Sequence, residues 1–410
     1  MKRQLFNLLL LITFFFSTSN VLTNDKKFEI SKNIDIYTSL LRELDLFYVD
    51  TIQVEKIVKS SIDEMLQGLD PYTVYIPEKE TNDFKFLTTG EYGGIGSMIS
   101  QKENNQIFFS EPYEGMPAQK IGIKAGDVII EIDGVKIKGK TVSDVSSMLK
   151  GQPGTTVKVK IERPFEKTIL TKEITREKIQ INPVSYYGVV GKNTGYILLN
   201  GFTDKASEEV KKAFFDLKKK HQIKSLILDL RDNPGGIIDE AVNITNFFIP
   251  KGLDVVSTKG KVKQWDNLYK SKNEPLDTEI PLLVLVNSNS ASASEIVAGA
   301  LQDLDRAVLV GNRTFGKGLV QATREVSYNG YLKVTTAKYY TPSGRCIQAI
   351  DYSHKNEEGT ATRIPDSLTT AFKTKNGRIV RDGGGITPDV ELQNNRKLTI
   401  TYYLLAKNMI

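Results

Sequence analysis

Three serines separated by alanines, Ser290, Ser292 and Ser294, follow an apolar run over residues 282–286. The run predicts a buried strand, and the apolar residues after the serines predict a helix. A hydroxyl at such a junction lies beside N–H groups that the first turn of the helix leaves free, and these groups can stabilise a developing oxyanion. Serine is also common as the N-cap of a helix. The turn therefore suggests either a nucleophile or an ordinary helix cap.

A nucleophilic serine needs a general base, and the chain holds only two histidines, His221 and His354, both in polar surroundings. A Ser-His-Asp triad is therefore not expected, and a lysine that burial keeps neutral is the remaining choice. Lys317 lies between Gly316 and Gly318 with apolar residues nearby, so its amine can be stripped of water. A glycine-rich turn without chemistry is the alternative interpretation.

Residues 311–317 also match the pattern G-x-x-x-x-G-K of a phosphate-binding loop. We reject that interpretation because the next position is Gly318 instead of a Ser or Thr, and because strands are predicted where a phosphate loop opens a helix. Residues 229–236 form another turn after an apolar strand, where Gly235 and Gly236 allow close backbone approach and free N–H donors, although an ordinary turn has the same composition. Together the turns predict one shared site at the carboxyl edge of a sheet.

Composition limits the chemistry further. One cysteine and two histidines leave almost no ligands for zinc, so we expect neither a metal nor a cofactor. A net charge of +6 spread over 410 residues does not indicate a nucleic-acid partner. The length is sufficient for two or three domains.

The elements that must position the site follow from hydrophobic periodicity. A helical pattern covers residues 28–69, and short alternating strands with one amphipathic helix at 141–150 cover 92–179. Apolar strands alternate with helices over 195–310, which predicts an α/β layer with parallel strands. Asn329-Gly330 predicts a hairpin.

Both ends of the chain are apolar. Lys2 and Arg3 precede an apolar run at 5–16, which is shorter than the roughly 20 residues that span a bilayer. This pattern predicts an export signal, with an uncleaved membrane anchor as the alternative, and hence a periplasmic or other extracytoplasmic location. Residues 398–405 are expected to need cover from the core or from a second subunit.

The chain resembles the C-terminal processing peptidases, also called tail-specific proteases, a family of exported or lumenal serine peptidases with an embedded PDZ domain. The motifs that carry the resemblance occur at 69–73, 231–236, 290–301, 314–321, 340–345 and 385–390. The resemblance implies an α/β fold, with a crotonase/ClpP-like catalytic core, an inserted β-rich PDZ domain and an N-terminal helical segment.

The expected domain boundaries follow from this resemblance and from the changes in pattern. Residues 1–23 are the signal peptide or anchor, and 24–91 are the N-terminal helical segment and the start of the core. Residues 92–179 are the PDZ domain, and 180–410 are the peptidase core with a C-terminal segment.

The family's catalytic roles transfer to matching positions. The resemblance implies that Ser292 is the nucleophile, that Lys317 is its general base, and that Gln321 orients the lysine. The oxyanion would be bound by the N–H of Ala293 and by that of Gly235 or Gly236, a choice that the sequence leaves open. Ser290 and Ser294 are expected to be structural, with hydroxyls that cap the following helix.

A loop at Gly94, Ile95 and Gly96 resembles the carboxylate-binding loop of PDZ domains, where a peptide adds a strand beside residues 97–99 and the helix at 141–150 forms the other wall. The implied function is an exported serine endopeptidase that recognises substrate C-termini and works by a Ser-Lys acyl-enzyme mechanism. Its partners would be proteins or peptides with free C-termini, and the N- and C-terminal segments could form a homo-oligomer. The alternative function is a non-catalytic PDZ peptide-binding scaffold on a crotonase-like fold.

Overall fold

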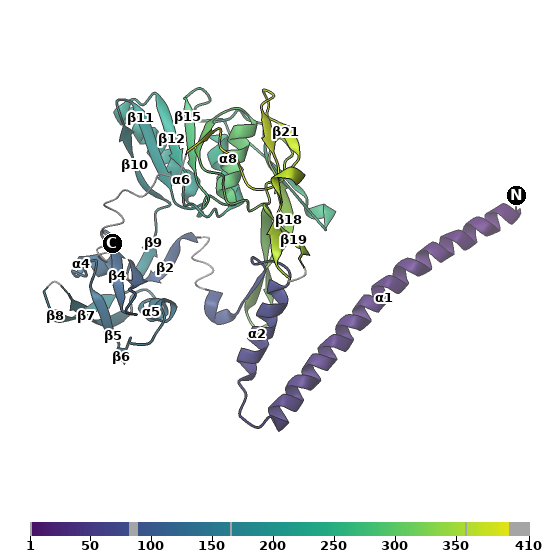
Figure 1. Cartoon of the computed structure of the whole chain (residues 1–410), viewed down its shortest axis with the longest axis horizontal. Helices are drawn as coiled ribbons and strands as arrows, with labels where there is room; N and C mark the ends of the chain where they lie inside the picture. Colours follow the sequence, from purple (N-terminus) through teal and green to yellow (C-terminus); the bar gives the residue numbers. More distant parts are fainter. Residues whose placement is uncertain (1, 82–88, 165, 357–358, 393–410) are drawn as a thin grey trace. The chain divides into compact units, whose positions relative to one another are not determined.

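The computed structural model describes residues 2–81, 89–164, 166–356 and 359–392, with side chains from Asp25 onward except that of Lys79 (Figure 1). The chain divides into two compact units, Met1–Gly68 and Leu69–Ile410.

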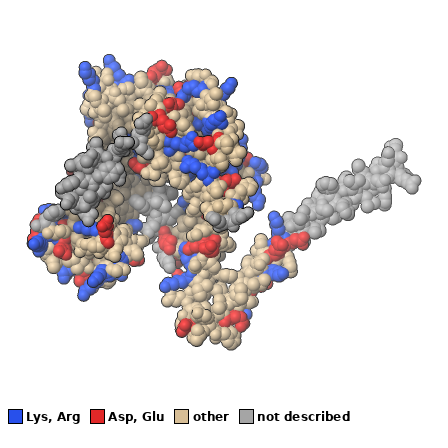
Figure 2. Space-filling view, viewed as in Figure 1, with Lys and Arg blue, Asp and Glu red and all other residues tan. Residues whose placement is uncertain are grey.

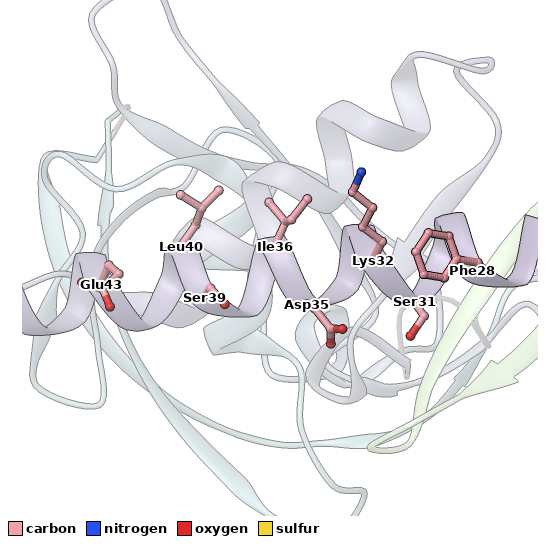
Figure 3. Close-up of a pocket in the computed structure, with 8 residues that line it drawn as sticks. All are labelled: Phe28, Ser31, Lys32, Asp35, Ile36, Ser39, Leu40 and Glu43. Carbon is pink, nitrogen blue, oxygen red and sulfur yellow. The ribbon is translucent and has the colours of Figure 1, made fainter.

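The first unit consists of two helices, α1 (Lys2–Phe47) and α2 (Val54–Gln67). The helical pattern at 28–69 is therefore interrupted, at residues 48–53, where three β-branched residues and an aspartate have low helix propensity. Apolar side chains of α1 remain exposed, including Phe28, Ile36 and Leu40. In Figure 3, Ile36 and Leu40 project from the same side of the helix.

Among the helices whose residues the structure describes, none has an apolar stretch long enough to cross a membrane. The apolar run at 5–16 lies outside the described side chains, and residues 398–405 lie outside the described residues altogether. The predictions of a signal or anchor and of a covered C-terminal segment therefore remain predictions.

A sheet of six strands forms the centre of the second unit as far as the structure describes it. The strands follow the order β10 (Val184–Val190), β11 (Thr194–Leu199), β12 (Ser225–Asp229), β15 (Leu282–Val286), β16 (Val308–Gly311) and β23 (Val390–Glu391). β10 is antiparallel to β11, and the remaining pairs are parallel. The predicted layer of parallel strands is confirmed.

Three helices connect these strands: α6 (Ala206–His221), α7 (Ile238–Asn246) and α8 (Ala293–Asp303). α7 packs against both α6 and α8. Every residue of α8 is buried, so this helix is enclosed by the protein. Since β12 and β15 are parallel neighbours, the turns that follow them meet at one edge of the sheet.

A second sheet lies on the other side of α8, which contacts its strand β13 (Asp254–Gly260). The strand order is β1 (Val74–Ile76), β18 (Gly330–Tyr340), β13 and β14 (Asn267–Lys270), and β17 (Leu319–Val326) also pairs with β18. Tyr328 and Asn329, between β17 and β18, both have positive φ, as a tight hairpin requires. The predicted hairpin is confirmed.

The β-rich module has its own sheet and its own hydrophobic core. The sheet order is β3 (Ser97–Gln101), β4 (Ile107–Pro112), β5 (Val128–Ile132), β7 (Thr156–Arg163) and β8 (Thr168–Thr175), with β6 (Val135–Lys136) paired to β5. Two helices complete it, α4 (Pro117–Lys120) and α5 (Val142–Leu149). Thr141 and Asp144 form a capping box at the start of α5, which matches the helix expected at 141–150.

Three strand pairs complete the described fold. They are β2 (Glu91–Gly94) with β9 (Glu177–Gln180), β19 (Ile350–Lys355) with β20 (Ala361–Arg363), and β21 (Ala371–Lys373) with β22 (Ile379–Arg381). On the face of the second unit seen in Figure 2, basic and acidic side chains are intermixed.

Candidate active site

The Ser-rich turn joins the end of β15 to the start of α8, and its outer serines anchor it to the neighbouring turn. The hydroxyl of Ser290 donates to the carbonyl of Leu230 at 2.7 Å, and that of Ser294 donates to the carbonyl of Asn233 at 2.9 Å. Both serines are buried and structural, but they tether two strand-end turns to each other, so the expectation that they cap the helix is wrong.

Ser292 differs from its neighbours in backbone conformation. Its φ is +56° and its ψ is −113°, a strained conformation for a residue with a Cβ. Tyr339 donates its hydroxyl to the carbonyl of Ser292 at 3.2 Å, and the N–H of Ser292 donates to Glu295 at 2.9 Å. These contacts hold the strained residue in place, with its side chain at a cleft.

That cleft has a volume of about 720 Å³. Its lining includes Gly235, Gly236, Ser292, Lys317, Gln321 and Lys333. The structure therefore brings the expected nucleophile, base, orienting amide and oxyanion glycines to one cavity. His221 and His354 are both exposed, as expected from sequence, and neither lines this cleft.

Lys317 lies in the loop between β16 and β17, and flanking glycines let this loop pack tightly. A Cβ on Gly316, whose φ is +89°, would lie 2.3 Å from the Cβ of Ala349. A Cβ on Gly318 would lie 2.8 Å from the backbone nitrogen of Gln348. The glycines are therefore required for the close packing that removes water from the lysine between them.

The environment of the Lys317 amine favours its neutral form. Burial, and secondly the positive charge of Lys333, lower the pKa of Lys317 to about 8, while Glu295 and Asp70 oppose the shift. The amine lies 4.4 Å from the centre of the Tyr72 ring. Lys317 is thus much closer to neutrality at physiological pH than an ordinary lysine.

Glu295 is a site residue that our sequence analysis missed. Its buried carboxylate accepts the N–H groups of Ser292 at 2.9 Å, Gly316 at 2.7 Å and Lys317 at 2.9 Å, as well as the hydroxyl of Thr314. One side chain therefore connects the backbone of the candidate nucleophile to that of the candidate base. Burial raises the pKa of Glu295 to about 7, although the four hydrogen bonds favour its charged form. The spacing Ser-x-x-Glu, typical of a capping box, was the available signal.

The turn after β12 supplies the oxyanion glycines. The N–H of Gly235 already donates to the side chain of Asn233 at 2.9 Å. The N–H of Gly236 has no acceptor among the described residues, and neither does that of Ala293 at the start of α8. A Cβ on Gly235 would lie 2.9 Å from the nitrogen of Ala293, so this glycine keeps the approach to that N–H open.

Gln321 lies on β17 and lines the cleft, but its side chain hydrogen-bonds to a residue other than Lys317. Its amide donates to the hydroxyl of Thr335 at 3.2 Å. Within the described residues, no hydrogen bond joins the side chains of Ser292, Lys317 and Gln321. Catalytic hydrogen bonds often form only when substrate is bound, so this arrangement is compatible with a resting enzyme.

The loop at Gly94, Ile95 and Gly96 lies in the β-rich module. The carbonyls of Ile95 and Gly96 accept hydrogen bonds from Ala118 and Tyr113, which fixes the loop. In the part of the chain that the structure describes, the N–H group of Ile95 has no acceptor, whereas that of Gly96 lies against the hydroxyl of Tyr92. The adjacent β3 is the terminal strand of its sheet as far as the structure describes it, and it contacts α5.

Among the described residues, no cluster of three or more His, Cys, Asp or Glu side chains could hold a metal ion. The cleft instead presents a hydroxyl, a buried amine and backbone N–H donors. This set of groups suits acyl transfer through a covalent intermediate.

Comparison with known proteins gives matches to both parts of the second unit. Residues 193–354 match the model of peptidase family S41, and residues 108–163 match that of the PDZ domain. A carboxy-terminal-processing protease of Bartonella bacilliformis is 39% identical over 323 residues, covering 77% of this chain and 74% of that protein. A Staphylococcus aureus protein named "Probable CtpA-like serine protease" is 38% identical over 319 residues, covering 77% of this chain and 62% of that protein.

The solved structure of a photosystem II D1 C-terminal processing protease shares 28% sequence identity with the chain. Its TM-score is 0.48, and the match covers 88% of this chain and 93% of that one.

Proposed function

Since the chain belongs to the carboxy-terminal-processing proteases of peptidase family S41 and carries a PDZ domain, we propose that it is an exported endopeptidase with Ser292 as nucleophile and Lys317 as general base. The observation that carries this proposal is the pairing of a strained serine with a buried lysine in one cleft, through a single carboxylate that binds the backbone of both. A cleft that only bound peptides would have no need to desolvate an amine.

In the proposed mechanism, the neutral amine of Lys317 takes the proton of the Ser292 hydroxyl as its oxygen attacks the scissile carbonyl carbon. The lysine amine must first leave the ring of Tyr72, where it lies at rest. The N–H groups of Ala293 and Gly236 bind the resulting oxyanion. We choose Gly236 over Gly235 because the N–H of Gly235 is already engaged by Asn233.

The tetrahedral intermediate then collapses, and the C–N bond breaks. The protonated Lys317 gives its proton to the leaving amine, and an ester joins Ser292 to the substrate. A water molecule, deprotonated by the same lysine, attacks this ester. The C–O bond to Ser292 then breaks, Lys317 returns the proton to the serine oxygen, and the new carboxyl terminus is released. Gln321 would orient the lysine once its side chain turns from Thr335 towards the amine.

Recognition of the substrate would use the PDZ domain. A peptide would add a strand to the open edge of β3, with α5 as the other wall of the groove. The N–H group of Ile95 would bind its terminal carboxylate, together with the backbone at Gly94 and with the N–H of Gly96 once this group turns from the hydroxyl of Tyr92. The substrates would therefore be proteins or peptides with free C-termini.

We also propose that the protein is exported and that it assembles with a second copy of the chain. The basic start and the apolar run at 5–16 support export to the periplasm or another extracytoplasmic compartment, by a cleaved signal or with a retained anchor. The exposed apolar side chains of α1, such as Ile36 and Leu40, support contact with a second copy of the chain (Figure 3). Light scattering of the protein with and without charged substitutions at these two residues would test the assembly.

Hydrolysis of an unfolded polypeptide by the wild type and by Ser292→Ala tests the catalytic proposal. Cleavage by the wild type and none by the variant is the expected result, and equal cleavage by both would show that the nucleophile is wrong. Absence of cleavage by both, with retained peptide binding, would favour the non-catalytic scaffold.

A further inference from the structure

Lys333 is a second lysine in the cleft that the catalytic proposal does not use. It lies on β18, opposite Thr323 of β17 and Val74 of β1. Lys333 lines the same cleft as Ser292 and Lys317. Tyr339, further along β18, also lines this cleft and donates its hydroxyl to the carbonyl of Ser292, so β18 borders the cleft at the nucleophile.

The ammonium of Lys333 has no carboxylate partner among the described residues. Burial lowers its pKa, and no attraction from an acidic group compensates. A partly buried cation without a carboxylate partner costs stability, and packing of the lysine stem alone would not require the charged end to face a catalytic cleft.

The four groups that face the amine of Lys317 come from three parts of the fold, which are β18, α8 and the turn before β1. Lys333 on β18 repels its positive charge, whereas Glu295 on α8 and Asp70 before β1 attract it. The ring of Tyr72 lies against it as well. Three of these four groups favour the charged amine, since an aromatic face also attracts a cation. Lys333 is the one charged neighbour that favours the neutral form.

We propose that Lys333 is a positioning residue for catalysis: its ammonium group disfavours protonation of the Lys317 amine by like-charge repulsion across the shared cleft. This inference rests on the proposed role of Lys317 as general base. Two interacting amines lose their protons in two steps that belong to the pair. Lys333 retains its proton in the first step, and Lys317 loses its proton and becomes the base.

The direction in which the pKa of Lys317 changes follows from the positive charge of Lys333. Loss of the Lys333 charge removes the repulsion, so the pKa of Lys317 rises and its neutral fraction at a given pH falls. The activity near pH 7 should therefore fall about threefold to tenfold, and the activity well above the shifted pKa should be unchanged.

The experiment measures kcat and kcat/KM from pH 5.5 to pH 10, on a peptide substrate without acidic side chains, for the wild type, Lys333→Met and Lys333→Arg. Lys338→Met is the matched control, because Lys338 is exposed on the same strand and does not line the cleft. We expect the acid limb of the profile to move to higher pH in Lys333→Met only. High salt should reduce the difference between this variant and the wild type, because it screens the repulsion.

The double variant Lys333→Met with Thr323→Lys returns an ammonium group to the cleft from the facing strand, since Thr323 also lines the cavity. We expect the acid limb of the pH profile to return to its wild-type position in this double variant. If the acid limb stays at the position seen in Lys333→Met, the shift results from altered packing of β18, and the proposal is overturned. An unchanged limb in Lys333→Met would also overturn it. So would a defect confined to the KM of acidic substrates, because Lys333 would then bind substrate.

The failure of this inference is distinguishable from failure of the proposed function. If Ser292→Ala retained the wild-type rate, the catalytic assignment would be wrong whatever the pH profiles of the Lys333 variants. If Ser292→Ala were inactive and Lys333→Met kept the wild-type profile, only the role of Lys333 would be lost.

Discussion

At the scale of single residues, the proposed chemistry depends on whether the amine of Lys317 is protonated. A general base must be neutral, and a lysine with a pKa of about 8 is neutral in roughly a tenth of molecules at pH 7. An ordinary lysine would be neutral in fewer than about one molecule in a thousand. Desolvation therefore supplies most of the difference between an inert and a usable amine.

This value gives a prediction for the pH profile of the wild type. Since the neutral fraction of Lys317 rises with pH through about 8, kcat/KM for a substrate without titrating groups should rise about tenfold per pH unit below pH 7 and level off above pH 9. Stopped assays in a series of buffers at constant ionic strength would measure it. A profile without slope between pH 6 and pH 9 would contradict the role of this lysine.

The hydrogen bonds of Glu295 lead to a second prediction, on the turnover and stability of Glu295→Gln. Oε2 of Glu295 accepts the N–H groups of Ser292 and Lys317, and Oε1 accepts that of Gly316, so the NH₂ group of Glu295→Gln removes the acceptor of one of these two sets. We expect kcat to fall by about tenfold to a hundredfold because the nucleophile and the base lose their common support. The free energy of unfolding should fall by about 1–3 kcal/mol.

A matched control is Glu240→Gln, which alters another buried carboxylate, one that accepts the N–H of Ser207 outside the cleft. Denaturant unfolding and steady-state kinetics should separate the two variants, since both lose stability but only Glu295→Gln loses turnover. Equal kcat values would show that the carboxylate supports the fold and not the site.

At the scale of elements, the site exists because two turns from neighbouring parallel strands are locked together. The turn after β12 and the turn after β15 share hydrogen bonds from Ser290 and Ser294. Gly235 is the point of closest approach, because a Cβ there would lie 2.8 Å from the Cβ of Ser292. The geometry of the oxyanion site is therefore a property of the pair of turns.

Gly235→Ala tests this property. Its φ of +100° disfavours alanine, and the new methyl group would collide with Ser292 and the nitrogen of Ala293. We expect kcat to fall by about 10²- to 10³-fold, as for loss of an oxyanion donor. Gly201→Ala is the control, because its Cβ would meet nothing closer than 3.9 Å. A Gly235→Ala enzyme with normal turnover would exclude this turn from the oxyanion site.

The elements themselves could be predicted from periodicity, because strands and helices are encoded locally. The strand at 282–286, the buried helix after it and the hairpin at Asn329-Gly330 all form as the sequence indicates. The break between α1 and α2 escaped prediction because a hydrophobic pattern continues through residues of low helix propensity.

Contacts between distant segments could not be predicted in this way. Tyr72 in the turn before β1 and Lys333 on β18 reach the amine of Lys317 from other segments of the chain, so no local spacing indicates them. The family resemblance indicated Ser292 and Lys317, but it did not reveal the charges that set the pKa of the base. The choice between Gly235 and Gly236 likewise needed the hydrogen bond from Gly235 to Asn233.

At the scale of the whole molecule, the proposal joins a binding module to a catalytic cleft on one chain. A terminal carboxylate that binds backbone N–H groups in the PDZ domain would raise the local concentration of its own chain at the cleft. Substrate preference would then depend on a group that is not near the scissile bond. This separation can be tested with substrates that differ only in their C-terminal group, a free carboxylate or an amide.

Two peptides of identical sequence, one with a free C-terminus and one amidated, should differ in KM by about tenfold or more, because hydrogen bonds to a charged group contribute about 1.5–3 kcal/mol. Gly96→Val should abolish the difference, since its Cβ would lie 2.4 Å from that of Met116. Gly115→Val has a similar positive φ but an uncrowded site, and so controls for backbone strain. Equal kinetics of the two peptides with the wild-type enzyme would exclude carboxylate recognition, whereas a preference that survives Gly96→Val would place it outside this loop.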